Sequence, residues 1–99
     1  MFTIHYAESA ERELAELPKF DAARIMDEVD EQLRVYPTTP SARRKPLEEV
    51  SPPWEPARPP VWQLRVGDFR VFYEVEEELH EVAVRAVRRK GRKTTAEIL

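Results

Sequence analysis

Apolar and polar residues alternate at the start of the chain, and a period of two is typical of a half-buried strand. The apolar side of this first predicted strand consists of Phe2, Ile4 and Tyr6. The same period returns in the second half of the chain, at residues 62–66, 70–75 and 81–87. Tight turns at Gly67-Asp68 and at Glu76–Leu79 separate these three runs, which therefore predict an antiparallel meander.

Between the first strand and the meander, apolar residues recur at the spacing of amphipathic helices. A short helix is predicted after Ser9, a candidate N-terminal cap, and Pro18 stops it. A longer helix is predicted from Asp21, another candidate cap, to Pro37. Its apolar stripe is predicted to hold Ala22, Ile25, Met26, Val29, Leu33 and Tyr36. Together the two helices predict an αα-hairpin that covers one face of the sheet and leaves the other face open.

Proline is concentrated between the helices and the meander. Eight of the nine prolines lie in residues 37–60, and five of them in Ser51–Pro60. Proline cannot donate a backbone hydrogen bond, so residues 51–60 are expected to form an extended surface loop rather than a helix or a central strand. The favoured interpretation is a spacer that Trp54 pins to the core, and the alternative is a proline-rich ligand for an aromatic groove.

The elements follow the order β-α-α-β-β-β, which predicts an α+β fold with a small antiparallel sheet and an N-terminal helical hairpin packed on one face. A last helical turn is predicted within Thr94–Leu99, with Thr94 or Thr95 as its cap. A chain of 99 residues can bury one small core. Residues 1–99 are therefore expected to form a single domain that includes the proline-rich loop.

The composition excludes several classes of chemistry. The chain has no cysteine, which excludes a disulfide framework, a thiolate metal site and a cysteine nucleophile. His5 and His80 lack the spacing of metal ligands, and two glycines cannot form a phosphate-binding loop, so we expect no cofactor and no metal. No apolar run approaches the ~20 residues of a membrane span, and the acidic start is unlike a secretory signal. A cytoplasmic protein is therefore expected.

The net charge of −3 hides an uneven distribution. Residues 1–56 hold 7 basic and 12 acidic residues, whereas residues 57–99 hold 9 basic and 7 acidic residues. Six of the nine residues in Arg85–Lys93 are basic and none is acidic, which is an electrostatic footprint suited to phosphate. A solvated strand end is the alternative interpretation. The low pI argues against indiscriminate binding of nucleic acid.

Two arginines favour the phosphate interpretation. Arg65 and Arg70 flank the Gly67-Asp68 turn, so they are expected on adjacent strands and on the face of the sheet opposite the helices. The planar fork of an arginine side chain matches two phosphate oxygens. Solvated arginines on an exposed sheet are the alternative, but the basic run at residues 85–93 tips the balance towards an anion site.

The segment Leu64–Val75 (LRVGDFRVFYEV) resembles the central hairpin of the RelE/ParE toxins of type II toxin–antitoxin modules. Lys45-Pro46-Leu47 and the ending VRAVRRKGRKTTAEIL also match this family, and the resemblance covers nearly the whole chain. It implies a small antiparallel sheet with two N-terminal helices on one side, and a cognate antitoxin as partner. It further implies one of two activities, because RelE members cleave mRNA in the ribosomal A site and ParE members inhibit DNA gyrase.

The resemblance also implies site residues. Arg70 corresponds to the arginine that contacts the scissile phosphate in RelE-type enzymes. Arg65 corresponds to the arginine before the turn, and Arg89 or Lys90 to the basic residue that closes the last long strand. These four residues are the candidate catalytic residues. The candidate RNA-binding residues are Lys45, Arg85, Arg88, Arg92 and Lys93.

The sequence departs from the family pattern in two places. Val61 and Gln63 stand where the best-known member has lysines, and residues 94–99 lack the tyrosine that stacks on a base there. RNA cleavage without a metal needs a base for the 2′-OH and an acid for the leaving 5′-oxygen, and arginine suits neither role. The nearest titratable residues in sequence are Glu74 and His80.

Three functions follow as hypotheses. The first is a ribosome-dependent, metal-independent mRNA endonuclease (an mRNA interferase) that inhibits translation, so that ribosome and mRNA are its partners. The second is a ParE-like toxin without nuclease activity that inhibits DNA gyrase. The third is a catalytically inactive member that only binds its antitoxin. The arginines and the basic run favour the first hypothesis, and the departures from the family pattern favour the second.

Overall fold

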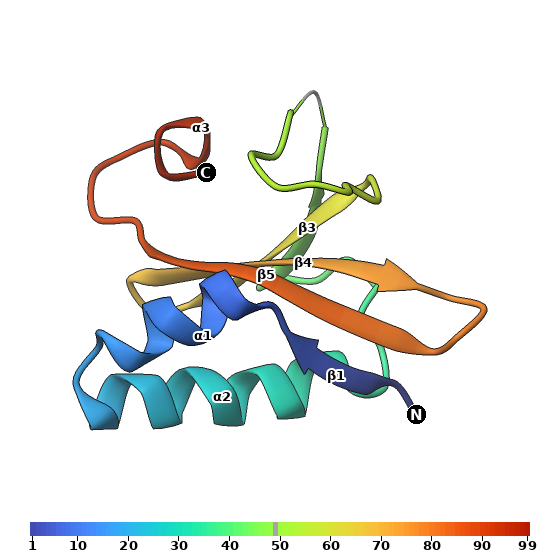
Figure 1. The fold of residues 1–99 in the computed structure, drawn as a ribbon, viewed down its shortest axis with the longest axis horizontal. Coiled ribbons are helices and arrows are strands. Elements are labelled where there is room, and N and C mark those ends of the chain that lie inside the picture. The colour runs from blue at the N-terminus through green and yellow to red at the C-terminus, as the bar shows by residue number, and fades with distance from the viewer. Residues whose placement is uncertain (49) are drawn as a thin grey trace.

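The computed structural model describes residues 1–48 and 50–99. Its elements are, in chain order, β1 (Thr3–Tyr6), α1 (Glu8–Ala15), α2 (Lys19–Leu33), β2 (Arg44–Leu47), β3 (Val61–Val66), β4 (Phe69–Glu76), β5 (Glu81–Arg89) and α3 (Thr95–Ile98). The five strands form one sheet in the order β1-β5-β4-β3-β2. α1 and α2 cover one face of this sheet, and α3 and the proline-rich loop lie over the other (Figure 1). The predicted α+β fold is confirmed.

The meander β3-β4-β5 is antiparallel, as the alternation predicted. Gly67 takes a φ of 58° in the turn between β3 and β4, a left-handed conformation that glycine adopts without steric cost. β1 pairs in parallel with the far side of β5, where Ile4 lies opposite Val82. Across the β3–β4 turn, Arg65 lies directly opposite Arg70, so the two arginines share one face of the sheet.

The sheet has one strand more than the sequence predicted. β2 lies within residues that we expected to form a connection, and it pairs antiparallel with β3 at the outer edge of the sheet. Pro46 takes part in this strand, opposite Trp62. Proline has no backbone N–H to donate. An inner strand has neighbours on both sides and uses all of its N–H groups, whereas an edge strand leaves those on its outer side unpaired. The proline content of this region therefore hid a real strand.

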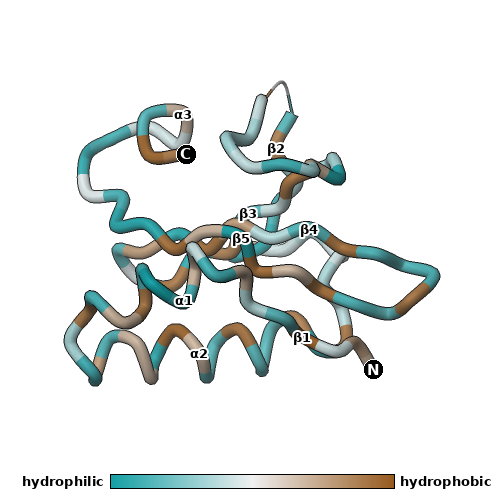
Figure 2. The backbone as a smooth tube through the Cα atoms, in the orientation of Figure 1, coloured by the Kyte–Doolittle hydropathy of each residue, from teal (hydrophilic) through white to brown (hydrophobic). Residues whose placement is uncertain are grey.

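The main core lies between the sheet and the two long helices. Ile25, Val29 and Leu33 of α2 are fully buried, and hydrophobic positions recur along the side of α2 that faces the sheet (Figure 2). The strands contribute Leu64, Val71, Tyr73, Val82 and Val84 to the same core. None of the helices in the described residues has the length and apolar character that crossing a membrane requires.

The apolar stripe of α2 is narrower than predicted. Met26 is 45% exposed and Tyr36 is 63% exposed. The helix ends at Leu33 rather than at Pro37, because Pro37 has no N–H to donate to the carbonyl oxygen of Leu33 and its ring would clash with that carbonyl group. Tyr36 therefore lies beyond the helix. Met26 lies at the edge of the stripe, next to the shallow groove between α1 and α2.

Both predicted N-terminal caps of these helices are wrong. α1 begins at Glu8, so Ser9 lies inside the helix. α2 begins at Lys19, directly after Pro18, and Asp21 lies in its first turn. Neither helix has a side-chain hydrogen bond at its cap. The acidic residues in the two first turns instead favour the positive end of each helix dipole.

Side chains of α1 bond to the part of β5 that extends beyond β1. Ser9 Oγ donates to the carbonyl oxygen of Arg85 at 3.1 Å, and the Val87 N–H donates to Glu13 Oε1 at 2.9 Å. An open sheet edge carries unpaired backbone groups that would otherwise pair with another chain. The hydroxyl of Ser9 therefore serves the sheet edge, which explains why it does not cap its own helix.

The face of the sheet that we predicted to be open carries a second, smaller core. Its residues are Val61, Phe72, Ala86 and Ile98, with Leu47, Trp54 and Leu99 packed against them. Trp54 thus pins the proline-rich loop to the sheet, as predicted. α3 is the predicted last helical turn, and Thr94 caps it in a capping box with Glu97. The expectation of an open face is wrong, because α3 and the loop cover part of it.

Candidate anion-binding site

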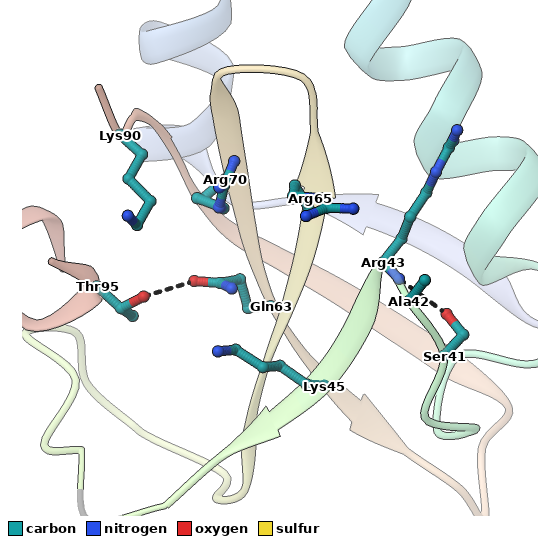
Figure 3. A pocket seen from close by; sticks show the side chains of 9 residues that line it. All are labelled: Ser41, Ala42, Arg43, Lys45, Gln63, Arg65, Arg70, Lys90 and Thr95. Atoms are coloured by element: carbon teal, nitrogen blue, oxygen red, sulfur yellow. Dashed lines mark hydrogen bonds between the residues drawn. The ribbon is translucent and has the colours of Figure 1, made fainter. Parts of the chain in front are cut away.

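The uncovered part of this face contains a hollow of about 260 Å³. β2, β3 and β4 supply its floor, and the segment after β5 and the start of α3 form one side (Figure 3). We call it the cationic hollow, and its lining residues are Ser41, Ala42, Arg43, Lys45, Gln63, Arg65, Arg70, Lys90 and Thr95. Five of these nine residues are cationic and none is acidic.

Arg70 is held in place by the turn that it follows. Its Nη1 donates to the carbonyl oxygens of Gly67 and Phe69, each at 2.9 Å. Burial lowers the pKa of Arg70 and the neighbouring Arg65 lowers it further, whereas Asp68 opposes these effects. An arginine remains protonated despite such a shift. Arg70 is therefore a fixed positive charge with donors left over for a ligand.

Arg65 lies opposite Arg70 but is free of such anchors. Its side chain is exposed, and within residues 1–48 and 50–99 it takes part in no ion pair. Its backbone N–H donates to the carbonyl oxygen of Arg43 at 2.9 Å, which ties β3 to the start of β2. Two guanidinium groups of equal charge on paired positions repel each other. An anion between them would relieve that repulsion.

Two lysines complete the cationic hollow from different elements. Lys45 lies on β2, directly opposite Gln63 of β3. Lys90 follows β5, and its backbone N–H donates to the carbonyl oxygen of Asp68 at 2.8 Å. That bond ties the end of β5 to the β3–β4 turn, which brings Lys90 beside Arg70. Of the nine lining residues, the lysines are the ones that can exchange a proton in ordinary acid–base chemistry.

Arg43 is a lining residue that sequence reasoning missed. Its guanidinium also bonds to Glu28 of α2 at 2.8 Å, so its charge is partly neutralised. The signal for it was present in the basic run Arg43-Arg44-Lys45. We could not distinguish its members from sequence, because the strand that orients them was itself unpredicted. Arg44 points elsewhere, to the Gln32 side chain at 2.6 Å.

Four of the predicted site residues meet in the cationic hollow: Arg65, Arg70, Lys90 and Lys45. Arg89 does not line it. Its guanidinium lies 4.6 Å from the ring centre of Phe69 and 3.6 Å from Asp68. Because neighbouring residues at the end of a strand point to opposite faces of the sheet, only one of Arg89 and Lys90 can reach the hollow. The structure brings Lys90 to the hollow.

The other basic residues of the predicted RNA-binding set lie outside the cationic hollow. Arg88 pairs with Glu13 and donates from Nε to the carbonyl oxygen of Ile98 at 3.0 Å, and burial lowers its pKa. Arg85 lies 5.5 Å from the ring centre of Trp54. Arg88 thus contacts α3, and Arg85 contacts the proline-rich loop, the two segments that cover part of this face. Arg92 and Lys93 lie exposed in the connection between β5 and α3.

Neither of the titratable residues proposed from sequence lies in the cationic hollow. Glu74 is only 3% exposed, and its carboxylate accepts a bond from the Arg58 N–H at 2.7 Å. It also lies 3.6 Å from Arg85. His80 packs against the ring of Phe2, with 5.1 Å between ring centres. Any proton transfer in the hollow must therefore use other groups.

A family model shows the family of the chain, and solved structures show its fold. A family model described as the ParE toxin of the type II toxin–antitoxin system parDE matches residues 4–94. None of the curated proteins compared with the chain matches it.

Three solved structures share the fold. One is the RelBE2 toxin–antitoxin complex from Mycobacterium tuberculosis, with 23% identity, a TM-score of 0.67, and 87% of this chain and 94% of that chain covered. Another is the archaeal RelE–RelB complex from Pyrococcus horikoshii OT3, with 20% identity, a TM-score of 0.70, and coverage of 92% and 97%. The third is the isolated Escherichia coli RelE toxin, with 16% identity, a TM-score of 0.65, and coverage of 98% and 92%.

Proposed function

This chain belongs to the RelE/ParE family of toxins from type II toxin–antitoxin systems, and we propose that it inhibits translation by cleaving mRNA on the ribosome. The observation that carries the proposal is the cationic hollow, where five cationic side chains converge without a carboxylate among the lining residues. Such a site suits a phosphodiester, which offers only acceptor oxygens. The proposed activity is that of a metal-independent endoribonuclease.

In this proposal the arginines stabilise charge. The 2′-oxygen of the RNA attacks the neighbouring phosphorus, the phosphoryl oxygens gain negative charge, and the bond to the leaving 5′-oxygen breaks. Arg70 is already fixed by the carbonyl oxygens of Gly67 and Phe69, so it needs no reorganisation when that charge develops. Arg65 approaches the same phosphate from the opposite strand.

The lysines move the protons. One amine takes the proton from the 2′-OH, and the other ammonium group delivers a proton to the leaving 5′-oxygen. Lys45 and Lys90 reach the cationic hollow from different elements, so they can act on two sides of one phosphate. They replace, from β2 and from the end of β5, the lysines that are missing at Val61 and Gln63 of β3.

The ribosome and an antitoxin are the proposed partners. The hollow is small and holds no aromatic residue among its lining side chains, so it cannot grip several bases. A ribosome that orients the mRNA would supply this positioning, which alone removes several kcal/mol of barrier in well-oriented reactions. Two of the solved neighbours are complexes of a toxin with its antitoxin. We place the protein in the cytoplasm with a cognate antitoxin of its own.

A gyrase inhibitor is the second candidate. The family model that matches the chain is that of the ParE toxin. In addition, α3 lacks an aromatic residue that could stack on a base. The cationic hollow would then hold an anionic surface of a partner and perform no chemistry. An inactive antitoxin-binding member would share this geometry.

Induced expression of the toxin alone separates these candidates. Transcript ends are mapped on ribosomes, and plasmid supercoiling is measured in the same cultures. mRNA cleavage predicts new ends that keep one phase relative to the codons, with supercoiling unchanged. Supercoiling defects with intact mRNA would identify gyrase as the target. If growth, transcripts and supercoiling all stay normal, the protein is an inactive member.

A further inference from the structure

Four arginines lie in one row across four neighbouring strands. Arg65 on β3 lies opposite Arg70 on β4, and Arg70 lies opposite Arg88 on β5. On the other side of β3, the Arg65 N–H donates to the carbonyl oxygen of Arg43, which continues the row to the start of β2. Residues directly opposite each other in a sheet share one face. We call these residues the arginine row, which runs across the strands on the face of the cationic hollow: Arg43, Arg65, Arg70 and Arg88.

Carboxylates from the helices neutralise the two ends of the arginine row but not its centre. Glu28 of α2 pairs with Arg43 at 2.8 Å, and Glu13 of α1 pairs with Arg88. The two central arginines take part in no ion pair within the described part of the chain. Like charges on directly opposite positions repel each other. The phosphate of the proposed reaction therefore belongs at the centre of the row.

Only one end of the arginine row is accessible to a neighbouring phosphate. At the β5 end, Arg88 Nε donates to the carbonyl oxygen of Ile98 at 3.0 Å, so α3 covers this arginine. At the β2 end, the side chain of Arg43 is 50% exposed. Figure 3 shows Arg65 pointing towards the β2 side of the hollow, where Arg43 lies. A nucleic-acid backbone that passes the centre can therefore continue along the row over β2 but not over β5.

Arg43 has donors left for a second phosphate. A guanidinium group carries five N–H donors, and the bond from Nη1 to Glu28 Oε2 uses one of them. The backbone around this side chain is fixed, because the Arg43 N–H donates to Ser41 Oγ at 3.2 Å and its carbonyl oxygen accepts from Arg65. Arg43 can therefore bond to a phosphate while it keeps its pair with Glu28.

We propose that Arg43 binds the phosphate next to the scissile one, so that the RNA backbone runs across the strands along the arginine row and leaves the site over β2. The inference rests on the proposed function, in that RNA is the ligand of the cationic hollow. The site then takes two successive phosphates, one at the centre of the row and one at Arg43. Glu28 is an opposing charge that weakens the second of these contacts.

Binding of a trinucleotide with two phosphodiesters tests this path. Its 2′-OH groups are methylated, so that it cannot be cleaved. In two further versions, one or the other phosphodiester is replaced by an uncharged methylphosphonate. We expect the less harmful replacement to weaken binding to the parent protein about tenfold, as for the loss of a hydrogen bond to a charged group. It should also make the slope of log K against log [salt] shallower by about 0.7. For Arg43→Ala, the same replacement should change neither the affinity nor the slope.

Glu28→Gln and Arg34→Ala are the matched variants. Glu28→Gln removes the opposing charge, so it should tighten binding of the fully charged trinucleotide about twofold to fivefold, as for an exposed ion pair. It should leave binding of the less harmful methylphosphonate version unchanged. A pair that serves stability alone predicts no such gain. Arg34 also pairs with a carboxylate of α2, Asp30 at 3.1 Å, but does not line the hollow. Arg34→Ala should therefore bind all three RNAs as the parent protein does.

Several outcomes overturn the inference. Arg43 is not a phosphate ligand if Arg43→Ala still distinguishes the charged RNA from the less harmful methylphosphonate version, if Glu28→Gln fails to tighten binding, or if Arg34→Ala behaves like Arg43→Ala. The inference also fails if the methylated trinucleotide does not bind the parent protein. If the Arg43 and Glu28 effects hold but induced toxin leaves mRNA intact, the second phosphate contact stands and the proposed cleavage fails.

Discussion

Arg65 and Arg70 face each other across two strands, yet the structure gives them different roles. Arg70 bonds to the turn that precedes it, whereas Arg65 is exposed and extends freely. The period of the strands and the position of the Gly67-Asp68 turn sufficed to predict that the two share a face. The sequence could not predict which one is anchored, because that depends on where the carbonyl groups of the folded turn point.

Replacing Arg65 should separate function from stability. We expect Arg65→Ala to change the free energy of unfolding by less than about 0.5 kcal/mol, as for an exposed side chain without special contacts. It should reduce mRNA cleavage about a hundredfold, as for the loss of one charge-stabilising donor. Arg12→Ala is the matched control, because Arg12 is an exposed arginine on α1 that pairs with Glu8 at 2.9 Å. Equal cleavage by the two variants would exclude Arg65 from the site.

Replacing Arg70 should affect both properties. Arg70→Ala removes two hydrogen bonds to the turn, so we expect it to lower the free energy of unfolding by about 1 kcal/mol as well as to abolish cleavage. Arg70→Lys keeps the charge but not the fork, and should recover little of either loss. Urea denaturation and a cleavage assay on the same samples check this. An Arg70→Ala protein with parental stability would show that the turn does not need the arginine.

Tyr6 makes the stability sensitive to alkaline pH. Burial, and then the charge of Asp30, raise the pKa of Tyr6 from 10.0 to about 12 in the folded protein. The neutral form is favoured by folding, so its contribution to stability is complete below pH 10 and is lost as the pH rises towards 12. The pKa of Tyr73 is raised by burial too and acts in the same direction. Urea denaturation at several pH values should show a smaller decline between pH 10 and 12 for Tyr6→Phe than for the parent protein. Parallel declines would contradict the role of Tyr6.

At the scale of elements, the helices and the meander were predictable because each has a long and regular apolar pattern. β2 was not, because four residues that include Pro46 carry too little pattern to identify an edge strand. The cover on the second face was missed for another reason. Phe72 lies on the face of the sheet that the alternation predicted to be open, and α3 and Trp54 cover it. Contacts of that kind join segments far apart in sequence and leave no local signal.

The capping box of α3 should stabilise this helix where it covers the second face of the sheet. Thr94→Ala removes the bond from the Glu97 N–H to Thr94 Oγ1, and we expect it to weaken α3 by about 1 kcal/mol. Amide hydrogen exchange of Ile98 and Leu99 should then accelerate several-fold, while the exchange of β4 stays slow. The same bonding lowers the pKa of Glu97, so acid that protonates this carboxylate should loosen α3 in the parent protein as well. Unchanged exchange at the end of the chain would show that packing alone holds α3.

At the scale of the whole molecule, charge and fold divide the protein into two sides. The helices α1 and α2, which are rich in acidic residues, cover one face of the sheet (Figure 1). The cationic hollow lies on the other face. The uneven charge of the two sequence halves is consistent with this division. The composition of the hollow was predictable only in part, because Lys45, Arg70 and Lys90 come from three elements whose meeting point depends on the register of β2 and on the bond from Lys90 to Asp68.

Cleavage of mRNA on programmed ribosomes by the purified toxin tests the central claim most directly, with Lys90→Met assayed beside the parent protein. Lys90 lines the cationic hollow and its backbone bond to Asp68 is kept in this variant. We predict that the parent protein cuts the mRNA in phase with the codons in the ribosome. Lys90→Met should cut it at least about a hundredfold more slowly, because a general acid or base contributes a factor of about that size or larger. Parent protein that leaves the mRNA intact, or Lys90→Met that cuts at the parental rate, would contradict the account.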